Sequence, residues 1–259
     1  MKIVLTPDWF LGKDVLIDSF SFIILFVFFI LCWRYYKLNK KKNFLYLGFG
    51  FLLIAIAQLA VVFTKLVLYY DTTFTQEIGQ IVVTYKFVSS VDIFYYIGFF
   101  FHKLLTLIGF YIIYRLPIKK KSPGDFILAL FFIIISVAFS ININFIFHIT
   151  VLVLLVMIIS NYYQIYKKNK FANTEILIIA FCILALAHLI FIFSELNKIL
   201  GGSKEYYGNI FVVANLIEAI SYITLLFLIV RIKYGTEKKK SYGYNLRYVG
   251  YNPRKRRKD

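Results

Sequence analysis

The chain has 259 residues, of which 61% are hydrophobic and 17% are charged, and its 30 Lys and Arg outnumber its 13 Asp and Glu. A water-soluble domain is closer to half apolar and a quarter charged, so this composition excludes a soluble enzyme, a coiled coil and a disordered chain. The apolar residues come in blocks of about twenty, the length that a helix needs to cross the hydrocarbon core of a bilayer. The sequence therefore predicts an all-α integral membrane protein.

Seven apolar stretches are bounded by charged or turn residues and predict a bundle of seven transmembrane helices. They cover residues 15–36, 44–69, 91–115, 125–141, 143–166, 174–198 and 209–232. The fourth and fifth stretches are separated only by a short polar link around Asn142, which predicts a tight helical hairpin. Residues 1–232 are expected to form the transmembrane domain, and residues 233–259 a basic, tyrosine-rich tail. No repeat between the two halves of the chain is detected in the sequence.

The distribution of Lys and Arg predicts the orientation. The segments after the first, third, fifth and seventh stretches carry 23 of these residues, and the opposite side carries six. Positive residues collect in cytoplasmic loops, so we expect a multi-pass cell-membrane protein with its N-terminus outside and its C-terminus in the cytoplasm.

The basic loops and tail also predict partners. One run in the tail exceeds what orientation requires: Arg254, Lys255, Arg256, Arg257 and Lys258. We expect the loops and tail to contact the anionic headgroups of the bilayer and a cytoplasmic protein partner, whereas nucleic acid is not an expected partner.

The distribution of small and polar residues predicts which helices form the interior. Helices in a bilayer pack through small residues and occasional polar side chains. Small residues are most frequent in the second, sixth and seventh stretches, and the third carries a polar stripe at steps of three and four residues. We therefore expect these four stretches to form the interior, and the first, fourth and fifth stretches to face lipid.

Polar residues inside the stretches are the candidate functional residues, because ionisable groups are costly in hydrocarbon. They are predicted to form an intramembrane polar cluster: Gln58, Asp92, His102, Lys103, His188, Glu195, Asn215 and Glu218. The outward-facing members, Asp92, His188, Glu195 and Asn215, are the predicted ligand site, and the others lie nearer the midplane. Lys103 and Glu218 lie at matching depth, which predicts a buried ion pair between the third and seventh helices. The sequence leaves open whether this pair is structural or belongs to a path for a proton, ion or ligand.

No motif for catalysis or for a cofactor is found. The three histidines, His102, His148 and His188, lie on three different stretches without zinc-ligand spacing, and His148 and His188 are the only two whose positions suit a pair of haem ligands. The seventh stretch has no Lys to hold retinal, and hydrolase and intramembrane protease motifs are absent. We expect no cofactor and no metal site, and the sequence favours a protein without enzymatic activity.

Two segments combine a basic loop or helix end with an adjoining apolar helix. The first runs from Trp33-Arg34-Tyr35-Tyr36-Lys37 to Lys42-Asn43-Phe44-Leu45-Tyr46-Leu47-Gly48-Phe49, and the second from Leu216-Ile217-Glu218-Ala219-Ile220 to Arg231-Ile232. These segments resemble the seven-helix sensor modules of prokaryotic membrane signalling proteins. The resemblance implies a sensor, but no kinase, cyclase or methyl-accepting domain follows Arg231, so its output would pass to a separate partner.

Three functions remain open at this stage. The leading hypothesis is a sensor or receptor-like ligand-binding module that relays to a cytoplasmic partner. The alternatives are a small solute or ion carrier or channel, and a non-catalytic membrane scaffold subunit. A ligand pocket in the outer half favours the first function, a continuous wet path to the cytoplasm favours the second, and a filled bundle favours the third. The ligand and the oligomeric state are not predicted.

Overall fold

The computed structural model describes residues 6–40, 42–70, 90–116, 123–140, 143–170 and 172–248. Within these ranges a short 3-10 helix, η1 (Asp8–Phe10), precedes seven α-helices. The α-helices are α1 (Lys13–Asn39), α2 (Lys42–Tyr70), α4 (Ser90–Arg115), α5 (Pro123–Ser140), α6 (Asn144–Asn169), α7 (Ala172–Ile199) and α8 (Lys204–Tyr248). They follow the seven predicted stretches in order, so the all-α class is confirmed.

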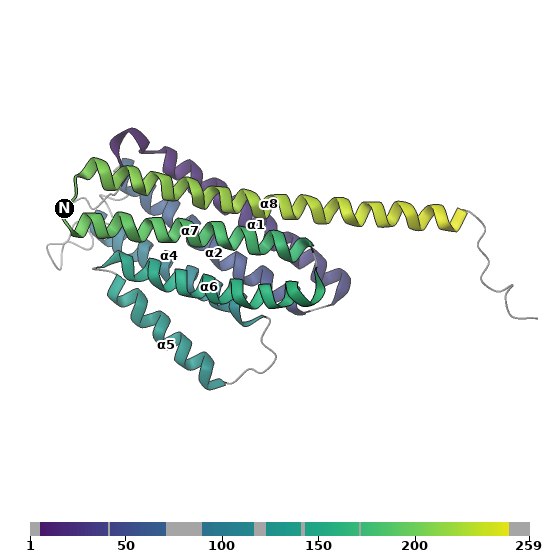
Figure 1. Ribbon diagram of the computed structural model, residues 1–259. Helices are drawn as coiled ribbons and strands as arrows, with labels where there is room; N and C mark the ends of the chain where they lie inside the picture. Colours follow the sequence, from purple (N-terminus) through teal and green to yellow (C-terminus); the bar gives the residue numbers. More distant parts are fainter. Residues whose placement is uncertain are drawn as a thin grey trace, which may run out of the picture.

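Six of the described helices, all except α5, are long and apolar enough to cross a membrane. This number of membrane-length helices is typical of a multi-pass membrane protein. The helix α5 is also apolar but has only 18 residues. At the other extreme, α8 has 45 residues and continues as one helix beyond the other six, past the predicted tail boundary at residue 233 (Figure 1).

The six long helices form a closed ring. Each packs against two neighbours, in the order α1, α2, α4, α6, α7, α8 and back to α1. The helix α5 lies outside the ring against α4 and α6 (Figure 1). Large apolar side chains of α5, such as Ile127 and Phe131, are mostly exposed, as expected for a stretch that faces lipid.

Two of the stretches predicted to face lipid are instead part of the ring. The helix α1 packs against α2 and α8 and buries Asp14 and Asp18. The helix α6 contributes Asn144, Phe147 and His148 to the interior. For α1 the prediction was wrong because it counted small residues, whereas the buried aspartates near the beginning of this helix require polar partners inside the bundle. The helix α6 is nonetheless the least buried of the six membrane-length helices, as expected for a stretch that is more exposed to lipid.

The ring consists of two three-helix units with the same order of helices. The first unit is α1, α2 and α4, the second is α6, α7 and α8, and α5 connects them. Helices pack extensively within each unit, while the two seams between units, α4 with α6 and α1 with α8, are narrower. Both α1 and α6 end at a left-handed lysine, Lys40 (φ 54°) and Lys170 (φ 48°), whose N–H donates to the carbonyl of Tyr36 or Tyr166 at 2.7 Å.

The sequence contains the same repeat at an offset of 130 residues. Twelve of the 31 residues from Tyr36 to Leu66 are identical to their counterparts from Tyr166 to Leu196. The matches include the packing residues Phe51, Ala55 and Ala57, which correspond to Phe181, Ala185 and Ala187. The expectation that the two halves are unrelated is therefore wrong. The repeat was missed because most matches are apolar residues, which coincide often by chance in any pair of membrane helices.

The third helices of the two units align at an offset of 112 residues, and this register is supported by matching contacts. A Cβ on Gly109 would lie 2.8 Å from the carbonyl oxygen of Gly50, so α4 and α2 approach closely there. The equivalent residues of the second unit are Ser221 and Ala180, and Ser221 Oγ donates to the Ala180 carbonyl at 2.9 Å. The two units are thus related in topology, in sequence and in the points at which their helices touch.

The helices define two ends of the bundle. The helices α1, α4, α6 and α8 run in one direction, and α2, α5 and α7 run in the other (Figure 1). We call the end at which α1 begins the N-terminal end. The opposite end is the basic end, because Lys40, Arg115 and Lys170 lie there. The half of the ring nearer the basic end is filled with buried apolar side chains, including Phe28, which lies against Phe51 with 4.4 Å between ring centroids.

Candidate functional site

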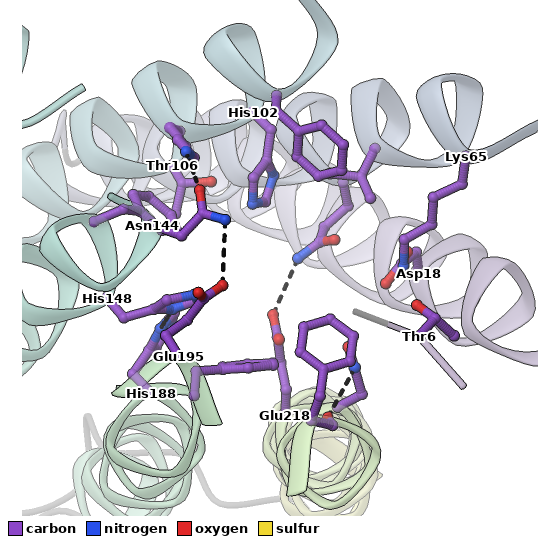
Figure 2. A pocket seen from close by; sticks show the side chains of 18 of the residues that line it. Thr6, Asp18, Lys65, His102, Thr106, Asn144, His148, His188, Glu195 and Glu218 are labelled. Atoms are coloured by element: carbon purple, nitrogen blue, oxygen red, sulfur yellow. Dashed lines mark hydrogen bonds and ion pairs between the residues drawn. The ribbon is translucent and has the colours of Figure 1, made fainter. Parts of the chain in front are cut away.

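A pocket lies inside the ring, in the half nearer the N-terminal end (Figure 2). The volume of this cavity is about 140 Å³. Its lining comes from all six ring helices and from Thr6, which precedes α1. The pocket therefore lies between the two three-helix units, and both units contribute polar side chains to it.

The structure brings together seven of the eight polar residues that the sequence singles out. These seven line the pocket: Gln58, His102, Lys103, His188, Glu195, Asn215 and Glu218. The eighth, Asp92, lies in α4, and its side chain is outside the described residues. The basic run Arg254, Lys255, Arg256, Arg257 and Lys258 also lies outside the described residues.

The predicted ion pair between Lys103 and Glu218 is not formed. Lys103 Nζ donates to the carbonyl oxygen of Ser140 at 2.7 Å and to Oδ1 of Asn144 at 2.8 Å. The prediction failed because matching depth does not place two helices side by side. The helices α4 and α8 are not neighbours in the ring, and Lys103 takes its partners from the last residue of α5 and the first residue of α6.

Glu218 has partners of its own on the other side of the pocket. Its Oε1 accepts hydrogen bonds from Gln58 Nε2 at 3.1 Å and from the Tyr222 hydroxyl at 2.9 Å. Both donors are neutral, and among the described residues no cation lies within ion-pair distance of this carboxylate. Lys103 and Glu218 thus face one pocket from α4 and α8, each held by neutral groups.

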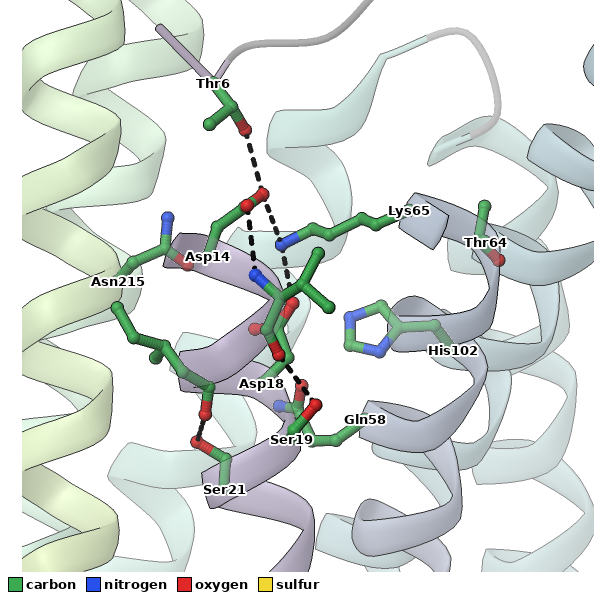
Figure 3. A network of polar contacts seen from close by, with 12 residues as sticks. Thr6, Asp14, Asp18, Ser19, Ser21, Gln58, Thr64, Lys65, His102 and Asn215 are labelled. Carbon is green, nitrogen blue, oxygen red and sulfur yellow. Dashed lines mark hydrogen bonds and ion pairs between the residues drawn. The ribbon is translucent and has the colours of Figure 1, made fainter. Parts of the chain in front are cut away.

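A buried ion cluster lies between α1 and α2, and the sequence analysis missed it (Figure 3). Lys65 Nζ lies 2.5 Å from Asp18 Oδ2 and 3.1 Å from Asp14 Oδ2. Asp14 also accepts hydrogen bonds from the hydroxyls of Tyr69 at 2.6 Å and Thr6 at 3.3 Å. The signal was present in the sequence, because two aspartates one turn apart in an apolar helix must find a cation.

The second unit has a different polar cluster at the equivalent positions. Asn144 and Glu195 correspond to Asp14 and Lys65. Asn144 Nδ2 donates to Glu195 Oε1 at 3.2 Å, so the contact between the first two helices of the unit is kept while its charges change. Glu195 Oε2 also lies 4.0 Å from Nζ of the partly exposed Lys198.

A pair of histidines faces the pocket from the second unit. His148 and His188 correspond to Asp18 and Gln58, and their Nδ1 atoms lie 3.0 Å apart. The ring of His148 also stacks on Phe191, with 4.8 Å between centroids. At this distance one Nδ1 donates to the other, and the tautomers decide which of the two is the donor, so the pair links α6 to α7.

Thr106 lines the pocket and has a buried hydroxyl without a hydrogen-bond partner among the described residues. It lies one turn beyond Lys103 on α4 and is 5% exposed. Among the buried side-chain atoms that the structure describes, only its Oγ1 lacks a hydrogen-bond partner. Buried hydroxyls are nearly always bonded, so this atom indicates a place for a group that the chain itself does not supply.

Apolar packing closes the ring below the pocket. The rings of Phe51 and Phe181, which are equivalent residues of the two units, stack at 6.3 Å with an angle of 6° between their planes. Phe110 and Leu225 are also buried in this layer. The pocket therefore has a floor made of matched residues from both units, and the described side chains beneath it are packed together.

The fold and the pocket define a class: a multi-pass helical membrane protein in which two repeated three-helix units enclose a polar pocket. No protein-family model, no curated protein and no solved structure matches the chain. The interpretation of the pocket therefore depends on its own geometry.

Proposed function

We propose that the chain is a carrier that moves a small polar solute across the membrane. The observation that carries this proposal is the position of the pocket at the interface of two repeated units. Many transporters consist of two repeats that hold the substrate between them, and the substrate is exposed to alternate sides as one repeat rocks against the other. The narrow seams between the units and the pocket between them fit this arrangement.

The proposed carrier crosses the membrane seven times. The helices α4 and α6 run in the same direction, so α5 has to return the chain from the basic end to the N-terminal end (Figure 1). Its 18 residues rise about 27 Å, close to the hydrocarbon thickness of about 30 Å. The excess of Lys and Arg at the basic end then assigns this end to the cytoplasm and the N-terminal end to the outside.

Reporter fusions test this topology. Fusions after residues 42, 121, 170 and 240 should all report the cytoplasm, because each of these points lies at the basic end in a chain with seven crossings. An external signal at residue 170 would mean that α5 does not cross, and the proposed orientation of the second unit would then be wrong.

In this proposed orientation the pocket would lie on the outer side and the floor on the cytoplasmic side. This arrangement fits a carrier whose binding site faces the outside and is sealed from the cytoplasm. Few polar contacts join the two units across the pocket, and they include Gln58 with Glu218 and Lys103 with Asn144. These are the contacts that a rocking motion would break and remake, while the contacts inside each unit would stay.

Uptake into liposomes tests the carrier function. The purified chain is reconstituted and supplied with an isotope-labelled extract of small polar metabolites, and solutes that enter are identified by mass spectrometry. At least one solute should enter. Its uptake should be lost in Val61→Trp, which fills the pocket, and kept in Phe63→Trp, which changes an exposed residue of the same helix. If no solute enters above the level of protein-free liposomes, the chain is not a carrier of the solutes supplied.

The second candidate is a receptor, and the length of α8 favours it. The helix α8 contributes Asn215 and Glu218 to the pocket and continues without a break to Tyr248, beyond the ring. A shift of α8 on ligand binding would therefore move a helical segment on the cytoplasmic side. The uptake experiment separates the two functions, because a receptor would retain a solute on the purified protein and transport none.

A further inference from the structure

We infer that the pocket takes a small zwitterion, such as a neutral amino acid, with its ammonium group at Glu218 and its carboxylate at Lys103 and Thr106. The inference rests on the proposed binding of a solute in this pocket and names the chemical class of that solute.

Glu218 provides the place for the ammonium group. Four carboxylates lie in or beside the pocket, and Asp14, Asp18 and Glu195 each have a lysine within 4.0 Å. Glu218 is the exception among the described residues, because both of its hydrogen-bond partners are neutral and use only Oε1. A carboxylate in a site of low polarity gains most from an opposite charge, and here the chain leaves that charge to a ligand.

Lys103 and Thr106 provide the place for the carboxylate. An ammonium group has three N–H donors, and Lys103 uses two of them on the neutral oxygens of Ser140 and Asn144. The third donor is available for an acceptor in the pocket. Thr106 follows three residues later on the same face of α4, and its buried Oγ1 has no partner. One carboxylate can accept from both groups, and this would satisfy the unpartnered hydroxyl.

The comparison of the two units explains why this place is open. Glu218 and Gln58 join the units on one side of the pocket, and their equivalents on the other side are Thr106 and His188. In the described structure these two do not bond to each other: Thr106 Oγ1 has no partner, and His188 pairs with His148 through Nδ1. The contact between Gln58 and Glu218 is therefore formed, while the equivalent contact between His188 and Thr106 is not. The ligand carboxylate fits at this second place, beside Thr106.

The rest of the pocket suits the body of a small amino acid. Phe99 and Phe211 are equivalent residues on α4 and α8, and Phe147 and Phe191 also line the walls. Aromatic walls accommodate an apolar side chain, and aromatic ring faces also attract an ammonium group. A zwitterion brings no net charge into the site, while each of its two charged groups meets an opposite charge. A ligand with only one charge would leave either Lys103 or Glu218 without an opposite charge.

Thermal melting of the full chain in detergent with matched probes tests the inference. The probes are a panel of neutral L-amino acids, together with compounds that lack one charged group: for leucine, 3-methylbutylamine and 4-methylpentanoate. At a hundredfold excess over Kd, at least one amino acid should raise the melting temperature by about 3–8 °C. Its amine and acid counterparts should have little effect. Equal stabilisation by the amine or the acid alone, or no stabilisation by any member of the panel, would overturn the inference.

Substitutions assign the two charged groups. For Glu218→Gln and for Lys103→Met, the amino acid concentration that gives the same rise in melting temperature should be at least tenfold higher than for the native chain. Glu205→Gln and Lys168→Met make the same chemical changes at exposed positions outside the pocket and should keep the native response. Thr106→Val should weaken the response while Thr106→Ser restores it. If the amino acid still binds normally to both pocket variants, its charges are not held as inferred.

The inferred ligand class and the proposed carrier function can fail independently of each other. If liposomes take up a solute that carries no ammonium or no carboxylate group, the carrier stands and the inferred ligand class is wrong. If an amino acid binds but does not enter liposomes, the ligand class stands and the receptor function replaces the carrier.

Discussion

The two three-helix units have the same order of helices but carry different side chains at several polar positions. Packing residues are retained between them, as in Phe51 with Phe181 and Ala57 with Ala187. At the N-terminal end, in contrast, Lys65 of the first unit corresponds to Glu195 of the second. Several positions that hold the helices together are thus alike, while many of the polar positions that face the pocket differ.

If the pocket binds the proposed ligand, this difference determines its specificity. A repeat with identical polar residues would give a symmetric pocket that recognises both ends of a ligand in the same way. The observed pocket has Thr106 on α4 at the position equivalent to Glu218 on α8, and Lys103 at the position equivalent to Asn215. One side is therefore suited to a negative group and the other to a positive group, although both sides are built on the same scaffold.

The largest expected effect comes from the ion cluster of the first unit. Lys65→Met removes the only cation that contacts Asp14 and Asp18 among the described residues, and stranding buried carboxylates should cost about 3–5 kcal/mol of stability. The equivalent change, Glu195→Gln, should cost about 1 kcal/mol, because Lys198 is partly exposed and the amide can still accept from Asn144. Thermal and chemical denaturation in detergent measure both. Equal losses would mean that the two clusters play the same structural role.

A somewhat smaller effect is expected at a close contact between α2 and α4. Gly109→Val should destabilise the chain by about 3 kcal/mol, because even its Cβ would lie 2.6 Å from Ile54 Cγ1 and 2.8 Å from the Gly50 carbonyl. At the equivalent position, Ser221→Ala removes one hydrogen bond to Ala180 and should cost about 1 kcal/mol. The matched control is Ala138→Val, which enlarges an exposed side chain on α5. A native melting temperature for Gly109→Val would contradict the close approach of α2 and α4.

The smallest expected loss of stability belongs to Glu218→Gln. A buried ion pair with Lys103 would have made this substitution costly, but the structure shows only neutral donors at Glu218. An amide can accept the same two hydrogen bonds, so the loss should be about 1 kcal/mol or less. Melting curves without ligand give this value directly. A loss of 3 kcal/mol or more would show that a cation of the protein does reach Glu218.

The sequence was sufficient to predict the helices and seven of the polar residues that line the pocket, and not sufficient to predict how the helices are arranged. Polar residues in apolar stretches are costly, so residues such as Gln58 and Glu218 could be placed inside without any knowledge of neighbours. Neighbours depend on packing over the whole bundle, which explains why the Lys103 partner was wrong and why α1 was placed against lipid. The repeat was detectable in principle, since the alignment of Tyr36 with Tyr166 needs no structure.

The central claim is that the pocket between the units opens to the outside and is closed towards the cytoplasm. Two single-cysteine variants on α8 test it most directly, after replacement of Cys32 and Cys182 by alanine: Asn215→Cys in the pocket and Leu225→Cys in the packed layer. A small membrane-impermeant thiosulfonate is added to the outer side of intact cells. The account predicts that Asn215→Cys reacts and that Leu225→Cys does not. Reaction of Leu225→Cys at a similar rate, or no reaction of Asn215→Cys, would contradict it.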